Sequence, residues 1–524
     1  MSGEGLLTRR AALAGAAGVG LIGLAGCGPG EQAPVVAQAA KPAGPPRQGG
    51  RIRVAGLSSS TADTLDPAKG SLSTDYVRHN MLYSGLTQFD GRLVPQPALA
   101  EALESDDRAT WTIRLRKGVE FHDGSSLTAG DVVYSLLRHK EPALGSKVKT
   151  IADQIVEARA TGPLEVQVRL SGPNADFPSI LATSHFAIIK DGTSDFRTGN
   201  GCGPFRLKAF VPGVRTVVTR NANYWKDGRP YLDEIELIGI PDEVARVNAL
   251  LSGDIHLANA ISPLSTRRLR AAGTHDVIET RSGLYTNLIM RQDVQPTGDP
   301  AFGLAMKHLF DRELIKKALF RGYAVIANDQ PIPPGHPYYL AGLPQRTHDP
   351  DKARFLLKRA GLLDVRLPIY ASPAATGSVD MASILQEAAG RIGLRLAVNR
   401  MPSDGYWSKH WMRHPLTFGN TNPRPTADLI FSLFYKSDAD WNKSGWKNAR
   451  FDQLLLAARG EADEARRRQL YADLQVLVHE KGGVGIPVFI SSLDGYDARL
   501  KGLSPIPIGG LMGYSFAEYV WWEG

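Results

Sequence analysis

Cysteine is almost absent from this chain, since the 524 residues contain only Cys27 and Cys202. A small secreted domain held together by several disulfides is therefore excluded. Long apolar runs are also missing near the N-terminus, where the weakly apolar stretch 11–23 has about 13 residues and a membrane span needs roughly 20. The stretch is too short to be a transmembrane helix.

The motifs that identify common enzymes are missing as well. The chain has no Gly-x-Ser-x-Gly elbow, no His-Glu-x-x-His helix and no phosphate loop. The run Gly18–Gly23 has the spacing of a dinucleotide-binding loop, but a Pro/Gly-rich stretch follows where that loop requires a helix. We therefore predict no catalytic residue, no cofactor and no enzymatic activity.

Basic residues do not gather in runs. The formal net charge is +8, and the 61 Lys and Arg are interspersed with 53 Asp and Glu. No basic stripe with interleaved aromatic residues is present, so nucleic-acid binding is not indicated. The charges are interpreted as solvated surface, and a mild preference for an anionic membrane or ligand stays open.

The N-terminus resembles a bacterial lipoprotein leader. Arg9 and Arg10 precede the weakly apolar run, and the small residues Ala25 and Gly26 precede Cys27. The resemblance implies export to the periplasm or cell surface, a leader over residues 1–27, and lipidation of Cys27 as a membrane anchor. Thr8–Leu13 is similar to a twin-arginine signal, which leaves the export route open. The alternative is an Ala/Gly helix at an ordinary N-terminus.

Residues 28–49 are rich in Ala, Pro, Gly and Gln, which favours a flexible tether. Beyond it, strand and helix patterns mix without repeats. The predicted strands start at 51–54 and cover 111–116, 164–170, 214–219, 235–240, 366–370, 394–398 and 486–490. The predicted helices begin after a Thr128/Asp131 capping box and cover 241–253, 301–320, 379–391, 451–459 and 464–480. The β-α-β order over 366–398 indicates an α/β lobe with a parallel strand pair.

Several short motifs in a fixed order carry a second resemblance. They are Leu65–Ala68, Leu82–Leu86, Trp111–Gly124, Leu127–Val133, Gly203–Phe205, Arg220–Trp225, Phe310–Glu313 and Asp349–Ala353. In this order the chain resembles the extracytoplasmic solute-binding proteins of peptide and nickel ABC importers, from about Gly50 to the C-terminus.

The resemblance implies an α/β, two-lobed, periplasmic-binding-protein-like clamp of type II with an extra subdomain inserted in the first lobe. The first lobe is expected over 50–84, 201–285 and 488–524, the inserted subdomain over 85–200, and the second lobe over 286–487. A monomer is expected to close around a solute by hinge motion and to deliver it to ABC permease subunits.

The second lobe contains the most informative loop, Gly419–Asp428. Peptide-binding relatives place there an aspartate that accepts the ligand's α-amino group, and the alignment puts Thr421 at that position. Arg424 could instead hold an anionic group of the ligand, or it could brace the loop by pairing with Asp428 or Asp440. Asn420, Asn422 and Asp428 are further candidates for ligand contact.

Other candidate ligand contacts follow from the same resemblance. Ser71, Thr74, Asp75 and Tyr76 are expected to face the ligand, although Ser73 or Thr74 could equally cap a helix. Tyr406, Trp407 and Trp441 are expected to line the site, or to be core residues. Asn328 and Asp329 are further candidates for ligand contact. Asp329 is expected to supply the missing carboxylate, or to act as a turn or cap residue.

His and Cys residues give weaker signals. Phe121–Gly124 is interpreted as a turn, and Cys202 as a small buried residue. His410 and His414 could share a helix face, but Lys409 and Arg413 would oppose a dication, so no metal site is predicted. The expected ligand is a peptide or peptide-like solute. A nickel chelate, haem or an opine-like conjugate is the alternative, and a secreted hydrolase is the weakest reading.

Overall fold

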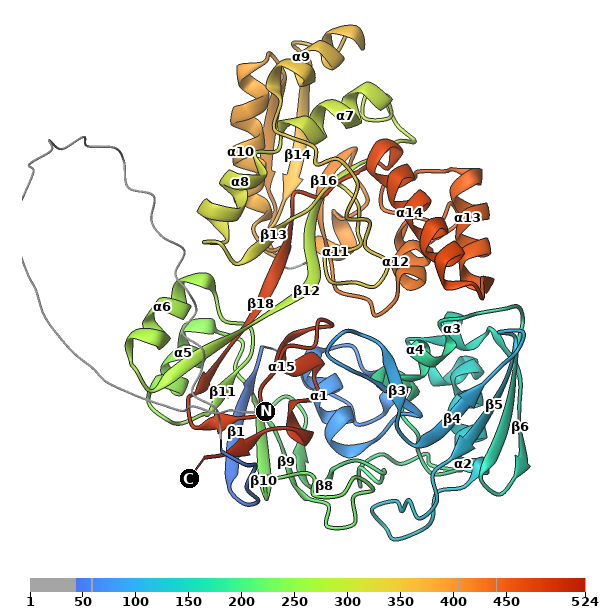
Figure 1. Cartoon of the computed structure of the whole chain (residues 1–524). Coiled ribbons are helices and arrows are strands. Elements are labelled where there is room, and N and C mark those ends of the chain that lie inside the picture. Colours follow the sequence, from blue (N-terminus) through green and yellow to red (C-terminus); the bar gives the residue numbers. More distant parts are fainter. Residues whose placement is uncertain (1–43, 58–59, 404, 440, 524) are drawn as a thin grey trace, which may run out of the picture. The chain divides into compact units, whose positions relative to one another are not determined.

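The computed structural model describes residues 44–57, 60–403, 405–439 and 441–523. The predicted leader, Cys27 and the tether up to residue 43 lie outside this range. Residues 45–524 form one compact unit, and the account below is of this unit (Figure 1). Among the described helices, none combines the length and the apolar character that crossing a bilayer would require.

A twelve-stranded mixed sheet organises this unit. The strand order is β15-β14-β16-β12-β18-β11-β1-β10-β9-β8, and β13 and β17 pair with β18 and β12. The strands are β1 Arg51–Gly56, β8 Phe205–Val211, β9 Arg215–Arg220, β10 Glu234–Gly239, β11 Leu257–Ala258, β12 His275–Met290, β13 Ala324–Ile326, β14 Arg366–Ala371, β15 Arg395–Arg400, β16 Leu416–Thr421, β17 Val484–Gly485 and β18 Val488–Asp497.

Strands β12 and β18 join two halves of this sheet. At one end β18 pairs with β11, and at the other β12 pairs with β16 (Figure 1). The β12–β18 register shifts between Thr280 and Leu284. Gly283 lies at this shift with φ +76°, and a Cβ there would lie 2.8 Å from a carbon of Pro333, so the site favours glycine. The predicted lobe boundaries fall inside β12 and at the start of β18, and they stay a prediction.

The first half of the sheet is accompanied by a separate four-stranded antiparallel sheet, β4-β5-β7-β6. Its strands enclose a core of their own, which contains Trp111, Ile113 and Val166 and is covered by Val132 and Leu136 of α2. The elements of this part are β2 Thr87–Phe89, β3 Pro95–Pro97, β4 Ala100–Glu104, β5 Thr110–Leu115, α2 Ala129–Leu137, α3 Lys149–Ala152, β6 Ile155–Gly162, β7 Glu165–Leu170 and α4 Phe177–Leu181. All of them lie within the predicted inserted subdomain.

Further short elements complete the first half. They are α1 Ser73–Leu82, α5 Glu243–Leu251, α6 Pro263–Ala271, β19 Leu500–Lys501, α15 Gly510–Gly513 and β20 Trp521–Trp522. Single turns of 3₁₀ helix occur at Pro67–Lys69, Arg138–Lys140, Pro142–Leu144, Ser184–Phe186 and Phe516–Glu518.

In the second half, β14 and β15 are parallel neighbours joined by α10 Ser378–Arg391, which confirms the predicted β-α-β unit. The other helices are α7 Pro300–Leu309, α8 Arg312–Leu314, α9 Pro350–Arg359, α11 Tyr406–Lys409, α12 Ala427–Phe434, α13 Ala449–Gly460 and α14 Glu464–Lys481. One buried cluster packs α7, α9 and α10 on the sheet, and another packs α12, α13 and α14 together.

Most of the predicted elements occur within a few residues of the predicted bounds. The Thr128/Asp131 capping box is confirmed, because Asp131 accepts a hydrogen bond from the Thr128 N–H at 2.7 Å. The single helix predicted over 301–320 is wrong. Phe310 has an extended backbone, and Asp311 caps a new short helix, α8, which continues as a π-helical turn over Ile315–Leu319.

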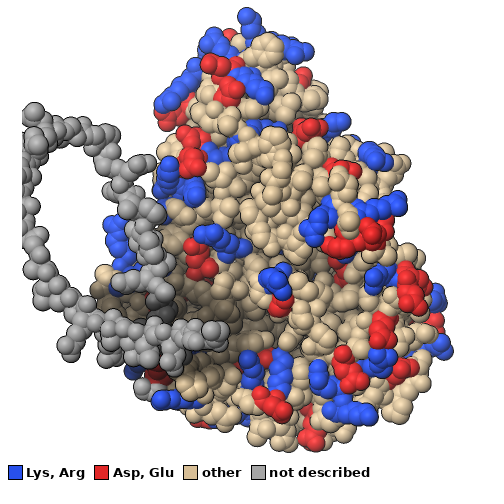
Figure 2. All heavy atoms as spheres, viewed as in Figure 1, with Lys and Arg blue, Asp and Glu red and all other residues tan. Residues whose placement is uncertain are grey.

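Two further interpretations of the sequence hold. Gly124 adopts φ +85° and Asp123 accepts a hydrogen bond from the Ser125 N–H, as expected of a turn. On the face seen in Figure 2, Lys and Arg are interspersed with Asp and Glu rather than gathered in one patch.

Candidate ligand-binding site

A cavity of about 680 Å³ lies where the two halves of the sheet meet. Residues from β12, from the loop after β16 and from two segments of the first half line it together. The lining residues include Arg92, Pro505, Glu279, Tyr285, Pro333, His336, Thr421, Asn422 and Arg424. The predicted residues Thr421, Asn422 and Arg424 are therefore brought to a concave surface.

The loop between β16 and α12 positions these three residues. It begins where Thr421 pairs in register with Tyr285 of β12, and it ends at Thr426, whose hydroxyl accepts a hydrogen bond from the Leu429 N–H and caps α12. Asn420, one residue earlier, is half-buried, and its side-chain oxygen lies 3.4 Å from the Thr286 hydroxyl. The loop is therefore short, and both of its ends are fixed: the first by strand pairing and the second by the helix cap.

Arg424 has no charged partner among the described residues, which do not include Asp440. Its guanidinium donates to the carbonyl oxygens of Asn422 and Pro423, at 3.3 and 3.0 Å, and lies 5.5 Å from the ring centroid of Phe434. Burial lowers the pKa of Arg424, while Tyr76 and Tyr514 of the first half and Tyr285 raise it. Arg424 also lines the cavity together with residues of both halves.

Asp428 does not brace Arg424, contrary to one of the two predictions for it. It is buried and accepts a hydrogen bond from the Arg459 guanidinium of α13 at 3.0 Å. Burial raises the pKa of Asp428, an effect that Arg459 opposes. The carboxylate is thus committed to packing α12 against α13, and the prediction that it contacts a ligand does not fit this position.

A residue that the sequence did not single out lies beside the loop. Lys443 is 3% exposed, and its amine donates to the Thr421 hydroxyl and to the Asn420 carbonyl. Burial, with Arg424 adding to it, lowers the pKa of Lys443 to about 7. The position at which relatives were expected to carry an aspartate therefore has a hydroxyl with two cations near it.

From the first half, the segment Ser71–Tyr76 begins α1. Asp75 accepts hydrogen bonds from the backbone N–H groups of Ser71 and Leu72, both at 3.0 Å, and pairs with Arg78 at 2.8 Å. The helix cap is thus Leu72 with Asp75, rather than Ser73 or Thr74. Asp75 and Thr74 are buried, so neither presents a free surface to a ligand.

Of the other two predicted residues in this segment, Ser71 is exposed and Tyr76 is half-buried. The Tyr76 ring lies 5.3 Å from that of His185 and 5.4 Å from that of Tyr514. Burial raises the pKa of Tyr76, and the positive charge of Arg424 opposes this rise.

The predicted aromatic residues divide into core and surface. Tyr406 is completely buried and donates its hydroxyl to the Phe418 carbonyl at 2.6 Å, so it is a core residue. Trp407 is exposed and packs edge-on against Tyr406 and Trp411. Trp441 is exposed and stacks on Phe434, the ring that Arg424 also covers.

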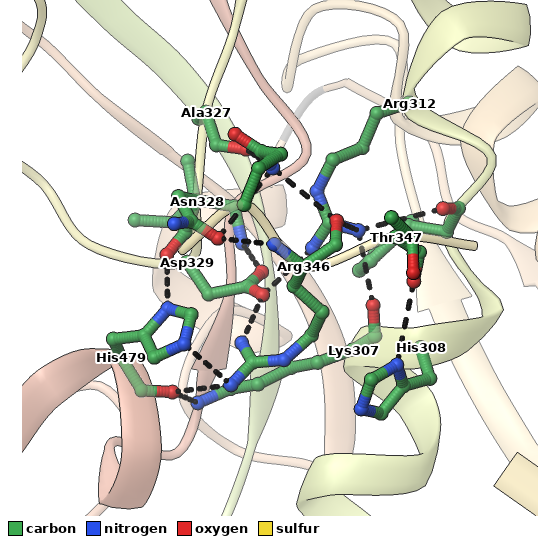
Figure 3. A network of polar contacts seen from close by, with 12 residues as sticks. Lys307, His308, Arg312, Ala327, Asn328, Asp329, Arg346, Thr347 and His479 are labelled. Carbon is green, nitrogen blue, oxygen red and sulfur yellow. Dashed lines mark hydrogen bonds and ion pairs between the residues drawn. The ribbon is translucent and has the colours of Figure 1, made fainter. Parts of the chain in front are cut away.

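Asn328 and Asp329 belong to a buried polar network, shown in Figure 3. Asp329 is 0% exposed, pairs with Arg312 at 2.7 Å and with Arg346 at 2.5 Å, and accepts a hydrogen bond from the Ile486 N–H. The Asn328 amide donates to the Pro344 carbonyl at 2.9 Å and accepts from the Arg346 N–H. The oxygens of Asp329 are satisfied inside the protein, which favours the structural alternative. That Asp329 contacts a ligand stays a prediction.

The His and Cys residues show no reactive arrangement. His410 and His414 are hydrogen-bonded to each other at 3.1 Å, and no group of three potential metal ligands occurs in the part of the chain that the structure describes. Cys202 is buried, and burial raises the pKa of its thiol. The His122 ring lies within hydrogen-bond distance of the carbonyls of Gly199 and Gly203, which fixes the turn.

Comparison with known proteins links this geometry to a class. A family model described as "Bacterial extracellular solute-binding proteins, family 5 Middle" matches residues 94–443. The glutathione-binding protein GsiB of Salmonella choleraesuis is 26% identical over 478 residues, which are 88% of this chain and 92% of that protein.

Solved structures share the fold. The ABC transporter substrate-binding protein CtaP of Listeria monocytogenes superposes with a TM-score of 0.81 at 20% identity, over 91% of this chain and 100% of that one. The periplasmic binding protein DppA of Helicobacter pylori, solved with the peptide STSA, gives 0.77 at 23% identity, over 91% and 99%. The predicted periplasmic-binding-protein fold is thereby confirmed.

Proposed function

Because the chain belongs to family 5 of the bacterial extracellular solute-binding proteins, which are not enzymes, we propose that it captures a peptide or peptide-like solute and delivers it to the permease of an ABC importer. The solute is bound in the cavity of about 680 Å³ at the junction of the two halves of the sheet. Membrane tethering through a lipidated Cys27 is part of the proposal.

The observation that carries the proposal is the unpaired charge at this cavity. Arg424 lines it and has only carbonyl partners among the described residues, and Lys443 lies buried behind Thr421. A site of this kind favours a solute with an anionic or strongly polar end facing the loop, rather than a free amine. Glutathione has two carboxylates and one amine, and the GsiB relatives are named for it. It is therefore the first solute to test.

Closure around the solute is supported by the connection between the halves. Among the described strands, only β12 and β18 carry the main sheet from one half to the other, and their register shifts near Gly283. A change of backbone angles at this shift would move one half against the other with few degrees of freedom. Closure then requires only that the solute binds the closed state better than the open state.

Native mass spectrometry of the freshly purified protein tests the proposal, because clamps of this kind often retain their solute. Melting curves with glutathione, a tripeptide mixture, a nickel–histidine complex, haem and an opine then rank the solute classes. A rise in melting temperature with glutathione or the tripeptides and no turnover supports the proposal. A rise only with the nickel complex, haem or the opine would replace the peptide-like solute with that alternative.

A further inference from the structure

Lys443 is a buried cation for which the described residues supply no carboxylate. It follows Trp441 and Asn442 in the segment between α12 and α13, and its amine lies 4.7 Å from the ring centroid of Phe434 and 5.9 Å from that of Trp411. Its hydrogen bonds go to a hydroxyl and a carbonyl, and the charged group that acts on it most is a second cation, Arg424.

Such a position is energetically unfavourable for an ammonium group. Removing a charge from water is costly unless an opposite charge or a full set of hydrogen bonds replaces the water. An apolar side chain of similar length, such as methionine, would fill the same volume without this cost. The presence of lysine therefore calls for an anionic partner that comes from outside the chain.

Two other buried polar groups lack hydrogen-bond partners in the part of the chain that the structure describes. The Asn287 side chain is 1% exposed, and neither its nitrogen nor its oxygen has a described partner. The buried indole nitrogen of Trp411, whose ring lies 5.9 Å from the Lys443 amine, likewise has none. Most buried polar groups in native proteins are satisfied, so two unsatisfied side chains close together indicate a missing ligand or water.

Strand geometry places these groups on one face of the sheet. Asn287 is two residues from Tyr285 on β12, and side chains two apart on a strand share a face. Asn287 pairs in register with Gly419, where an added Cβ would lie 2.9 Å from the Trp411 indole nitrogen. Tyr285 pairs with Thr421, whose hydroxyl accepts from Lys443. The amide, the indole N–H and the amine thus lie along one face of the sheet.

We propose that Lys443, Trp411, Asn287 and Thr421 form a subsite that binds a carboxylate of the solute. The inference rests on the proposed solute-binding function and names the chemical group of the solute that the site recognises. Tyr285 and Thr421 line the cavity, so the subsite lies directly behind its wall. A carboxylate accepts several hydrogen bonds at once, and it would be a negatively charged partner for the Lys443 amine.

The test uses acetate, the simplest carboxylate, so that it does not depend on the identity of the solute. The full chain is labelled with ¹⁵N, and the signal of Trp411 among the 8 tryptophans is assigned with Trp411→Phe. Titration with acetate at constant ionic strength should shift the Trp411 indole N–H in a saturable way. The shift should be lost in Lys443→Met and kept in the control Lys447→Met, which removes an exposed lysine four residues away.

Stability without acetate gives a second, independent result. Lys443→Met should melt at the same temperature as the parent or higher, because it removes an uncompensated charge. A clearly lower melting temperature would show that the amine supports the fold, and this would overturn the proposal. A Trp411 shift of equal size in Lys443→Met, or no shift in the parent, would also overturn it.

Solute binding separates this proposal from the proposed function. Calorimetry with glutathione compares the parent with Lys443→Met and Lys447→Met. If glutathione binds and Lys443→Met weakens binding at least tenfold, both proposals are supported. If it binds all three proteins equally, the solute-binding function stands and the carboxylate subsite is wrong. If neither glutathione nor the tripeptide mixture binds, the peptide-like solute is wrong, and the acetate titration still decides the subsite.

Discussion

Arg424 and Asp428 lie four residues apart, yet among the described residues only Asp428 has a charged partner. Asp428 is held by Arg459, whereas Arg424 contacts carbonyl oxygens and aromatic rings. A carbonyl replaces water around a guanidinium but does not neutralise its charge. Arg424 therefore keeps the capacity to bind an anion, and Asp428 does not keep the capacity to bind an amine.

Replacing Arg424 with alanine should weaken binding of an anionic solute such as glutathione. A hydrogen bond to a charged group contributes about 1.5–3 kcal/mol, which is about a tenfold or greater loss of affinity. Calorimetry measures this loss, with Arg413→Ala as the control, because Arg413 is an exposed arginine in the same half. Equal affinities for Arg424→Ala and the parent would show that the guanidinium only braces its loop.

The lowered pKa of Lys443 predicts a pH dependence of stability. In the folded protein this pKa is about 7, and in the unfolded chain it is near the ordinary value of roughly 10.4. Between these values the unfolded chain binds one proton more, so this residue makes the free energy of unfolding rise with pH. Below about pH 7 the cost of the buried charge is fully present.

Denaturant unfolding of the parent and Lys443→Met from pH 6 to pH 10 measures this effect. The difference between the two proteins should change across the window, in the direction that favours the parent at high pH. The groups facing the amine are Arg424 from its loop and Tyr285 from β12, with Tyr435 behind the latter. Lys307, whose pKa is also lowered to about 7, contributes equally to both proteins. Parallel curves would contradict the prediction.

At the scale of residues, the sequence located a candidate loop from its motif, but it did not reveal which distant residues contact that loop. The loop Thr421–Arg424 could be located from its motif, but Lys443 lies 22 residues after Thr421, and only folding brings them together. The sequence left Asp329 open between a ligand contact and a turn residue, and its partners could not be found, because Arg312 and Arg346 each lie 17 residues away. Burial of both ends of such pairs leaves no periodic signal in the sequence.

At the scale of elements, β12 is the longest of the described strands that the sequence patterns missed. Alternation predicts strands with one buried face, but the second half of β12, from Leu284 to Met290, is almost entirely buried on both faces. Conversely, the amphipathic pattern over 301–320 continued through Phe310, although the chain is extended there. Hydrophobic periodicity therefore predicts elements with one exposed face, and it fails for an element that is buried on both faces.

The register shift in β12 can be tested with two glycines of nearly equal backbone angle. Gly283 has φ +76° and would place a Cβ 2.8 Å from Pro333, whereas Gly273 has φ +72° with open space around it. Gly273→Ala should cost about 1 kcal/mol for the left-handed backbone alone. Gly283→Ala should cost more, because the clash with Pro333 adds to the strain. Equal losses in denaturant unfolding would show that Pro333 moves away without cost.

At the scale of the whole molecule, the anchor is tested with Cys27. The residue lies outside the described residues, so its role rests on the leader that precedes it. Cys27→Ser should abolish lipid labelling and release the protein from the membrane fraction, as judged by fractionation and labelling with a palmitate analogue. Cys202→Ser is the matched control, because Cys202 is the other cysteine and is buried. Unchanged labelling and retention of Cys27→Ser would remove the lipoprotein assignment.

A second contact between the predicted lobes lies away from the cavity. Asp176, in the predicted inserted subdomain, pairs with Arg467 of α14 at 2.7 Å, and both side chains are largely buried. Beside it, the Ala175 N–H donates to the Arg459 carbonyl at 3.0 Å. If the lobes separate when the solute leaves, this pair must separate too, and its stabilisation belongs to the closed state alone.

Asp176→Asn should therefore favour the open state without touching the cavity. Solution scattering of the parent should give a smaller radius of gyration with bound solute than without it. In Asp176→Asn we expect weaker solute binding, by about 1.5–3 kcal/mol, and a larger radius at the same subsaturating solute concentration. Asp153→Asn, which breaks an exposed pair with Lys149, should change neither quantity. Tight solute binding without compaction in the parent would contradict hinge closure itself. If Asp176→Asn compacts as the parent does, hinge closure stands, but the Asp176–Arg467 ion pair takes no part in it.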